Sequence, residues 1–300
     1  MTGKFIDQTY QFKAAATENI RQQWHDLAYM DGARHKLDVY LPNQVKPQAG
    51  YPVIVDIYGG GLWRGDKSSF KMNPALQLLA AGYAIVSPDY SLLWQAAFPA
   101  QVSEMQAVLH WVKQFGADYG LDGQRLALMG ESSGAQLAVL TALQRPGTAL
   151  FDERWDNNER APICAVIAMY GPYVIDQFPQ QFAATKTQPK YAETGSAGSF
   201  EGQLLGKKRP VDVPELVQKY NPLNYLTPSM PPILGIAGTA DQVVPYQQTV
   251  ELMQAAQDLV GDHRAQWHLV PGAHHGITDF MTDEIVQMKL DFLNEFMGGN

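Results

Sequence analysis

Short apolar runs alternate with helical patterns over most of this 300-residue chain, and that alternation restricts the possible folds more than any other feature. Six of the runs end at Gly, Pro or Asp, as buried parallel strands tend to do: 51–61, 82–90, 125–130, 163–171, 233–241 and 265–272. Parallel strands need crossover connections, which are usually helices. The pattern therefore predicts an α/β fold with a mostly parallel central sheet and helices on both faces.

An earlier run, HKLDVYLP at 35–42, has the two-residue period of a half-buried strand, and we expect it to be an outer strand of the sheet. Helices are predicted between the strands, and one of them begins at Pro74 and ends at Gly82. Apolar stripes at helical spacing mark three more: Met105, Val108, Val112 and Phe115, ending at Gly116; Leu252, Met253, Ala256 and Leu259, ending before Gly261; and Ile285, Met288, Phe292 and Phe296.

Residues 176–232 interrupt this alternation. They are polar and rich in Gln, Lys, Gly, Ser and Pro, and they contain one short helical candidate, ELVQKY. The segment is too long for an ordinary connection between two elements. We interpret residues 176–232 as a cap or lid inserted into a single domain that spans residues 1–300.

Composition and charge exclude several classes of partner. With 46% hydrophobic and 17% charged residues, the chain is able to bury one large core. The net charge of −8 is spread without acidic or basic blocks, which argues against nucleic acid or a membrane surface and favours a small neutral or weakly acidic ligand. The N-terminus lacks an apolar signal region and no run approaches ~18 apolar residues, so we expect the cytoplasm.

The single cysteine, Cys164, excludes an intramolecular disulfide and a thiol-rich metal cluster. It lies in the apolar run ICAVIAMY, so we expect it in the core. The histidines outside the motifs below show no metal-ligand spacing, and we expect them to be structural: His25, His35, His110, His263 and His268.

The stretch ALMGESSGAQLAVL, residues 127–140, carries a G-x-S-x-G motif directly between a predicted strand and a predicted helix. That context is the one required by the nucleophile elbow of α/β-hydrolases. Ser132 is the nucleophile candidate. Ser133 contributes its backbone N–H at the helix N-terminus, where a developing oxyanion is stabilised. Taken alone, the pentapeptide fits an ordinary turn serine equally well.

Three further motifs support the first. The sequence Tyr58-Gly59-Gly60-Gly61 is similar to the HGGG-type motif whose N–H groups complete an oxyanion hole, although a flexible turn is the alternative. Asp241 follows a predicted strand in GTADQVVP, where a turn or N-cap role is the alternative. PGAHHGI places two histidines beyond the last strand. The chain order Ser, Asp, His is that of α/β-hydrolases.

Together, YGGGLWRGDK, DYSL, GESSGAQLA, NPLNY, GTADQVVPY and GAHHGI resemble the α/β-hydrolase esterases of the acetyl esterase and hormone-sensitive-lipase-like group, closest to the branch with feruloyl and acetyl-xylan esterases. The resemblance runs from about His35 to the C-terminus. It implies the α/β-hydrolase fold and a catalytic triad of Ser132, Asp241 and His275. His275 is chosen over His274 because the family's catalytic histidine stands immediately before a glycine.

The resemblance also implies an oxyanion hole made by the backbone N–H groups of Gly60, Gly61 and Ser133. Tyr58 departs from the family pattern, because it stands where these enzymes often have His. Any hydrogen bond by which that histidine orders the glycine loop must come from a phenol or be lost. Candidate substrate-binding residues are Tyr58, Trp63, Asp66, Trp94 and Phe98, for which loop bracing and core packing are the alternatives.

The predicted chemistry is two-step acyl transfer, in which His275 activates Ser132, an acyl-enzyme forms, and water then hydrolyses it. We expect a serine carboxylesterase for small-molecule esters with short acyl chains, acetyl to butyryl, and hydroxycinnamoyl esters such as ferulate as a second class. The polar composition of residues 176–232 argues against a lipid interface. The few apolar residues of this segment are better suited to closing over a small acyl or aryl group: Phe178, Phe182, Tyr191, Phe200, Leu204 and Leu205. No metal or organic cofactor is expected, because nucleophile, base and oxyanion donors all come from the chain.

Other functions remain open at this point. An arylformamidase or another amide hydrolase would use the same site. A peptidase of the prolyl oligopeptidase type usually carries a propeller domain, for which the sequence has no room. A non-catalytic ligand-binding protein on a hydrolase scaffold is the alternative from another class, although such proteins typically lose a triad member.

Overall fold

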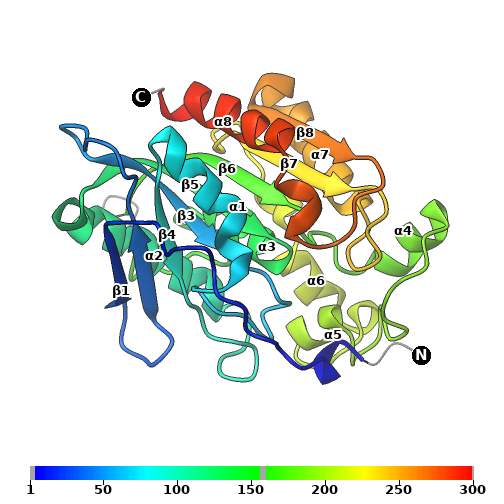
Figure 1. The fold of residues 1–300 in the computed structure, drawn as a ribbon. Helices are drawn as coiled ribbons and strands as arrows, with labels where there is room; N and C mark the ends of the chain where they lie inside the picture. The colour runs from blue at the N-terminus through cyan, green and yellow to red at the C-terminus, as the bar shows by residue number, and fades with distance from the viewer. Residues whose placement is uncertain (1–3, 156–159, 299–300) are drawn as a thin grey trace.

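In the computed structural model, which describes residues 4–155 and 160–298, eight strands form one sheet in the order β1-β2-β4-β3-β5-β6-β7-β8 (Figure 1). The parallel strands are β3 (Tyr51–Ile57), β4 (Ala84–Pro88), β5 (Leu121–Glu131), β6 (Ile163–Met169), β7 (Ile233–Gly238) and β8 (Ala265–Val270). Strand β2 (Lys36–Tyr40) pairs antiparallel with β4 and with β1 (Gln23–Ala28). The predicted mostly parallel α/β fold is confirmed.

Each predicted run overlaps an observed strand, and β5 extends beyond its run at both ends. Strand β2 is not the edge of the sheet. Strand β1 lies outside it and was missed, because its residues are exposed or only partly buried and carry no apolar alternation. The central strand β3 shows the opposite pattern, since all of its residues are buried. Such a strand reads as a continuous apolar run because both of its faces are covered.

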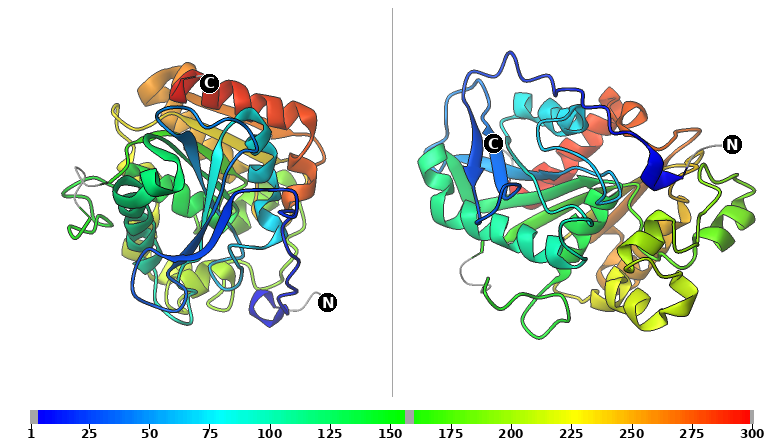
Figure 2. Two further views of the ribbon diagram at one scale, coloured as in Figure 1. Left: turned by 60° about the vertical axis from the view of Figure 1, so that its left-hand side comes forward. Right: turned by 90° about the horizontal axis from the view of Figure 1, so that it is seen from below.

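Helices cover both faces of the sheet, as predicted, and Figure 2 shows the sheet between them. Successive side chains of a strand point to opposite faces. Val53 and Val55 pack in the core formed with α2 (Ala100–Phe115), α3 (Ser133–Leu143) and α7 (Gln247–Arg264). Ile54 packs in the second core, formed with α1 (Asn73–Leu76) and α8 (Asp283–Met297).

The predicted helix boundaries agree with the structure in most places. The segment after Pro74 is α1 continued by a 3₁₀ helix, Gln77–Ala81, which ends at Gly82 in the left-handed conformation. Helix α2 ends immediately before Gly116. Gly261, with φ 79° and ψ 166°, interrupts the helical conformation of α7 where the sequence predicts an end.

Residues 176–232 lie between β6 and β7 and hold three short helices: α4 (Phe178–Thr185), α5 (Phe200–Leu204) and α6 (Pro214–Tyr220). Helix α6 is the predicted ELVQKY segment. Phe178 and Phe182 of α4 form a small apolar cluster with Val244, a residue of the loop after β7. In Figure 1 the three helices lie together at one end of the molecule, beside the N-terminal segment.

Cys164 packs against the second core, the one formed with α1 and α8, but its expected full burial is wrong. The residue is only partly buried at the start of β6, where the strand is not yet fully covered. Within the described residues, no helix is long and apolar enough to cross a membrane. Nor do three His, Cys, Asp or Glu side chains gather in a metal-binding arrangement anywhere in the described part of the chain.

Candidate active site

Ser132 stands on a tight turn between β5 and α3. Its backbone angles, φ 54° and ψ −126°, are rare for a residue with a side chain and cost on the order of 1–3 kcal/mol. The two flanking glycines make this turn possible. A Cβ on Gly130 would lie 2.4 Å from the Gly134 carbonyl oxygen, and one on Gly134 would lie 2.0 Å from that of Ile57. The close approach of α3 to the sheet therefore requires the two glycines of the motif.

His275 joins Ser132 to Asp241 through two hydrogen bonds. With the proton on Nδ1, the ring donates to Asp241 Oδ2 at 2.7 Å, and Nε2 accepts from Ser132 Oγ at 3.0 Å. Asp241 is buried, and its other oxygen accepts from the backbone N–H groups of Val243 and Val244 at 2.7 and 2.9 Å. The three side chains meet because they follow β5, β7 and β8, whose C-terminal ends lie at one edge of the parallel sheet.

The glycine loop after β3 is tied to the Ser132 turn. Gly59 N–H donates to Glu131 Oε1 at 2.6 Å, and the same oxygen accepts from Lys71 Nζ at 2.9 Å. Burial alone would raise the pKa of Glu131, but the Lys71 ammonium holds that pKa below its usual range. Leu62 N–H donates to Ser133 Oγ at 3.2 Å, which connects the loop to α3.

The predicted oxyanion donors lie around Ser132. Gly60 and Gly61 line the same cavity as Ser132 and His275. Ser133 is the first residue of α3, so its N–H has no partner within the helix. Two of the three predicted donor residues therefore line the cavity that holds Ser132, and the third directly follows it in the chain.

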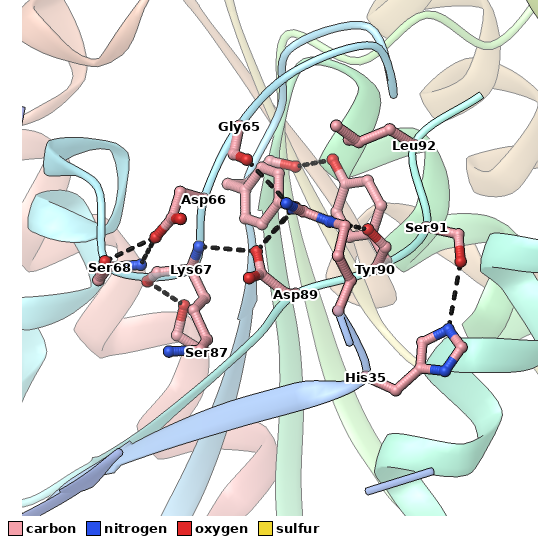
Figure 3. A network of polar contacts seen from close by, with 12 residues as sticks. His35, Gly65, Asp66, Lys67, Ser68, Ser87, Asp89, Tyr90, Ser91 and Leu92 are labelled. Atoms are coloured by element: carbon pink, nitrogen blue, oxygen red, sulfur yellow. Dashed lines mark hydrogen bonds and ion pairs between the residues drawn. The ribbon is translucent and has the colours of Figure 1, made fainter. Parts of the chain in front are cut away.

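A largely buried network of hydrogen bonds anchors the glycine loop. Arg34 Nη2 donates to Tyr58 Oη at 2.6 Å and to Asp89 Oδ1 at 2.8 Å, and the Tyr58 hydroxyl donates to Asp89 Oδ1 at 3.0 Å. Figure 3 shows Asp89 between Lys67 and Tyr90, and the Lys67 N–H also donates to it, at 3.0 Å. The phenol of Tyr58 therefore anchors this loop at the position where the family often has His.

The burial of Asp89 disfavours its charged form, whereas the neighbouring Arg34 favours it. Burial raises the pKa of Asp89 to about 6, although the Arg34 guanidinium opposes that shift. Gly65, at the end of the loop, packs so closely on Tyr58 that a Cβ there would lie 2.3 Å from the ring. The loop is thus fixed by Tyr58 directly after β3, by Arg34 before β2 and by Asp89 after β4.

A cavity of about 180 Å³ lies over Ser132. The glycine loop and the triad residues Ser132 and His275 form one side of it. Four aromatic side chains contribute to the rest of the lining: Phe5, Phe178, Tyr191 and Phe200. The last three belong to residues 176–232, whose apolar side chains we expected to close over a small acyl or aryl group. Phe5 was missed, because its place in the cavity depends on tertiary packing alone.

The five predicted substrate-binding residues do not line this cavity. Trp63, Trp94 and Phe98 line a separate depression with Tyr220, and the Trp94 Nε1–H donates to the Trp63 carbonyl at 3.2 Å. Asp66 holds its own turn through the N–H and hydroxyl of Ser68, at 2.9 and 2.6 Å. Tyr58 is buried beneath the loop. Bracing and packing, the alternatives considered for these positions, describe the contacts of Tyr58, Asp66 and Phe98.

His274 and His275 have different surroundings. The backbone N–H of His274 donates to Asp279 Oδ2 at 2.9 Å, and its side chain is 70% exposed. The ring of His275 packs edge-on against Tyr170, with 4.9 Å between ring centroids. Of the two, His275 alone is within hydrogen-bond distance of Ser132 in the described structure.

Known proteins are similar to this chain in sequence and in fold. A family model described as BD-FAE matches residues 37–256. Esterase LipQ of Mycobacterium tuberculosis is 25% identical over 278 residues, which cover 92% of this chain and 62% of LipQ. The chain therefore spans less than two thirds of the length of that curated relative.

Two solved structures are also similar. A truncated form of a carbohydrate esterase from gut microbiota gives a TM-score of 0.79 at 26% identity, covering 95% of this chain and 99% of that one. A bifunctional GH43-CE protein of Bacteroides eggerthii gives a TM-score of 0.79 at 26% identity, covering 92% of this chain and 35% of that one.

Proposed function

This chain belongs to the BD-FAE family of α/β-hydrolase esterases, and from that premise we propose that it is a serine carboxylesterase for short-chain acyl esters. The observation that carries the proposal is the hydrogen-bonded series Asp241–His275–Ser132 at the floor of a small cavity. The similar protein LipQ is named an esterase, which supports this proposal.

In the proposed mechanism, His275 Nε2 takes the proton from Ser132 Oγ as the oxygen attacks the ester carbonyl carbon. Asp241 fixes the tautomer of His275 and stabilises the imidazolium that forms. The N–H groups of Gly60, Gly61 and Ser133 hold the oxyanion. The imidazolium then protonates the leaving alcohol, and a water activated by His275 hydrolyses the acyl-enzyme, which restores Ser132.

The size of the cavity supports a small substrate group. Its volume of about 180 Å³ is below the ~300–1,000 Å³ of pockets that hold drug-sized ligands. We propose acetyl to butyryl esters first and hydroxycinnamoyl esters such as ferulate second. The two similar structures, one named a carbohydrate esterase and one GH43-CE, support a sugar as the alcohol. We propose that residues 176–232 form the cap of a single domain. The location of the protein in the cytoplasm stays a prediction.

The test compares Ser132→Ala with Ser133→Ala on p-nitrophenyl esters of two to sixteen carbons, methyl ferulate and acetylated xylan. Ser132→Ala should lower kcat/KM by roughly 10³-fold or more, because the nucleophile is gone. Ser133→Ala should lose much less, since it keeps the backbone N–H and loses only side-chain hydrogen bonds, to the Leu62 N–H and to Tyr90. Both variants should keep the wild-type circular dichroism spectrum.

Equal losses in the two variants would contradict the assignment of Ser132. A wild-type protein that hydrolyses no ester but cleaves aryl formamides would favour the amide hydrolase. Binding of esters without turnover would favour the ligand-binding protein. A maximum at long acyl chains would contradict the proposed role of the cap.

A further inference from the structure

Phe5 reaches the cavity from the far N-terminal end of the described chain. It opens a 3₁₀ helix, Phe5–Asp7, and its side chain is 8% exposed. The ring packs directly on Gly61, because a Cβ on that glycine would lie 2.2 Å from Phe5 Cζ. Figures 1 and 2 both show the N-terminal segment beside α5, the helix that begins with Phe200. The ring thus occupies the space that the absent side chain of Gly61 leaves.

Two aromatic residues of the 176–232 segment also pack on the Phe5 ring. Tyr191 meets it edge-on at 5.6 Å between centroids, with 87° between the ring planes. Phe200 meets it at 6.1 Å and 67°. Edge-to-face pairs at these separations are the favoured aromatic geometry. The ring is therefore fixed between the glycine loop and the proposed cap.

The backbone around Phe5 accepts hydrogen bonds from Arg64, near the glycine loop, and donates one to Glu193 of the proposed cap. Arg64, three positions after Gly61, donates from Nη2 to the Phe5 carbonyl at 2.8 Å and from Nη1 to the Gln8 carbonyl at 2.5 Å. Its guanidinium also lies 4.4 Å from the centroid of the Phe5 ring. On the cap side, Glu193 Oε1 accepts from the Phe5 N–H at 2.5 Å. An acyl group that needs the space of the ring would have to break these contacts.

We propose that Phe5 is a specificity-determining residue that closes the acyl side of the cavity and sets the largest acyl group Ser132 accepts. This inference rests on the proposed esterase function. If the Gly61 N–H holds the oxyanion, the carbonyl oxygen of a bound ester lies beside Gly61 and so close to the Phe5 ring. We assign this side of the cavity to the acyl chain, and the alcohol series below tests that assignment. A rigid wall there rejects longer chains, and each methylene changes kcat/KM by roughly 10–200-fold in a fitted pocket.

The test measures kcat/KM for two substrate series in the full chain. One varies the acyl group from acetyl to dodecanoyl on p-nitrophenol, and the other varies the alcohol on a constant acetyl group. Phe5→Ala should raise the octanoyl-to-acetyl ratio by about 10-fold or more. Phe5→Trp should narrow the profile toward acetyl, which simple loosening of the segment would not do. The alcohol series should keep its wild-type profile in both variants.

Phe12→Ala is the matched control, because this phenylalanine lies on the same N-terminal segment and is 55% exposed. It should leave both series unchanged. If Phe5→Ala does not fold, Phe5→Leu keeps an apolar anchor and should give a smaller shift in the same direction. Unchanged acyl profiles, or a shift in the alcohol series alone, would overturn the inference while Ser132-dependent hydrolysis stands. A wild type without Ser132-dependent hydrolysis would overturn the proposed function as well.

Discussion

At the scale of single residues, the neighbours His274 and His275 form a natural comparison. The His275 side chain is 18% exposed and bonded to buried Asp241, whereas His274 is 70% exposed. His275→Ala should lower kcat on p-nitrophenyl acetate by roughly 10³-fold or more, because the general base is lost. His274→Ala should keep most of the activity. A larger loss in His274→Ala than in His275→Ala would move the proposed base by one position.

The motifs predict the reacting groups of the site better than its walls. Ser132 and Asp241 stand at turns whose position after a strand is readable from the sequence. The choice between the two histidines needed the resemblance to a family, because spacing alone fits both. Of the wall residues, those in 176–232 were expected only as a group, and Phe5 was not predictable from its place in the chain. Arg64 lines the cavity whereas its neighbour Trp63 lines another depression, since consecutive loop residues point in different directions.

At the scale of one element, the glycine loop depends on the hydroxyl of Tyr58. Tyr58→Phe removes a group bonded to Arg34 and Asp89, and leaves these buried charges with fewer partners. The free energy of unfolding in urea should fall by roughly 1–3 kcal/mol. Because Gly60 and Gly61 lie on this loop, kcat should fall more than KM rises. Tyr119→Phe, at the opposite end of β5 from Ser132, is the control and should change neither kinetic constant.

An unchanged kcat in Tyr58→Phe, together with normal stability, would show that the loop keeps its shape without this phenol.

The helices and strands differ in how well the sequence predicts them. The buried parallel strands form continuous apolar runs and were predicted. Helices α4 and α5 have only 8 and 5 residues and no long apolar stripe, so they depend on tertiary contacts and were missed.

At the scale of the whole molecule, stability should depend on pH through Lys289 of α8. Burial lowers the pKa of Lys289 to about 8, against the opposing attraction of Asp56. Between this value and the unfolded pKa of 10.5, the unfolded chain binds a proton that the folded chain does not. The free energy of unfolding should therefore rise from pH 8 to about 9.5 relative to Lys289→Met, by on the order of 1 kcal/mol per pH unit.

The measurement is urea unfolding of both proteins at several pH values in that window. Parallel curves for the wild type and Lys289→Met would contradict the prediction, because they would mean that Lys289 holds its proton equally in both states. Lys289→Arg is a useful comparison, since a guanidinium stays charged throughout the window and should remove the rise as well.

The two hydrogen bonds of His275 span very different lengths of chain: 34 positions to Asp241 and 143 to Ser132. Contacts of such separation are slow to form, because a long loop must close before any of its stabilisation is gained. Strands β5 to β8 must all be in register before His275 meets both Asp241 and Ser132. Local helices form much earlier in folding than this arrangement. The proposed ester hydrolysis should therefore report completed folding of the sheet, and a nascent or partly refolded chain should be inactive.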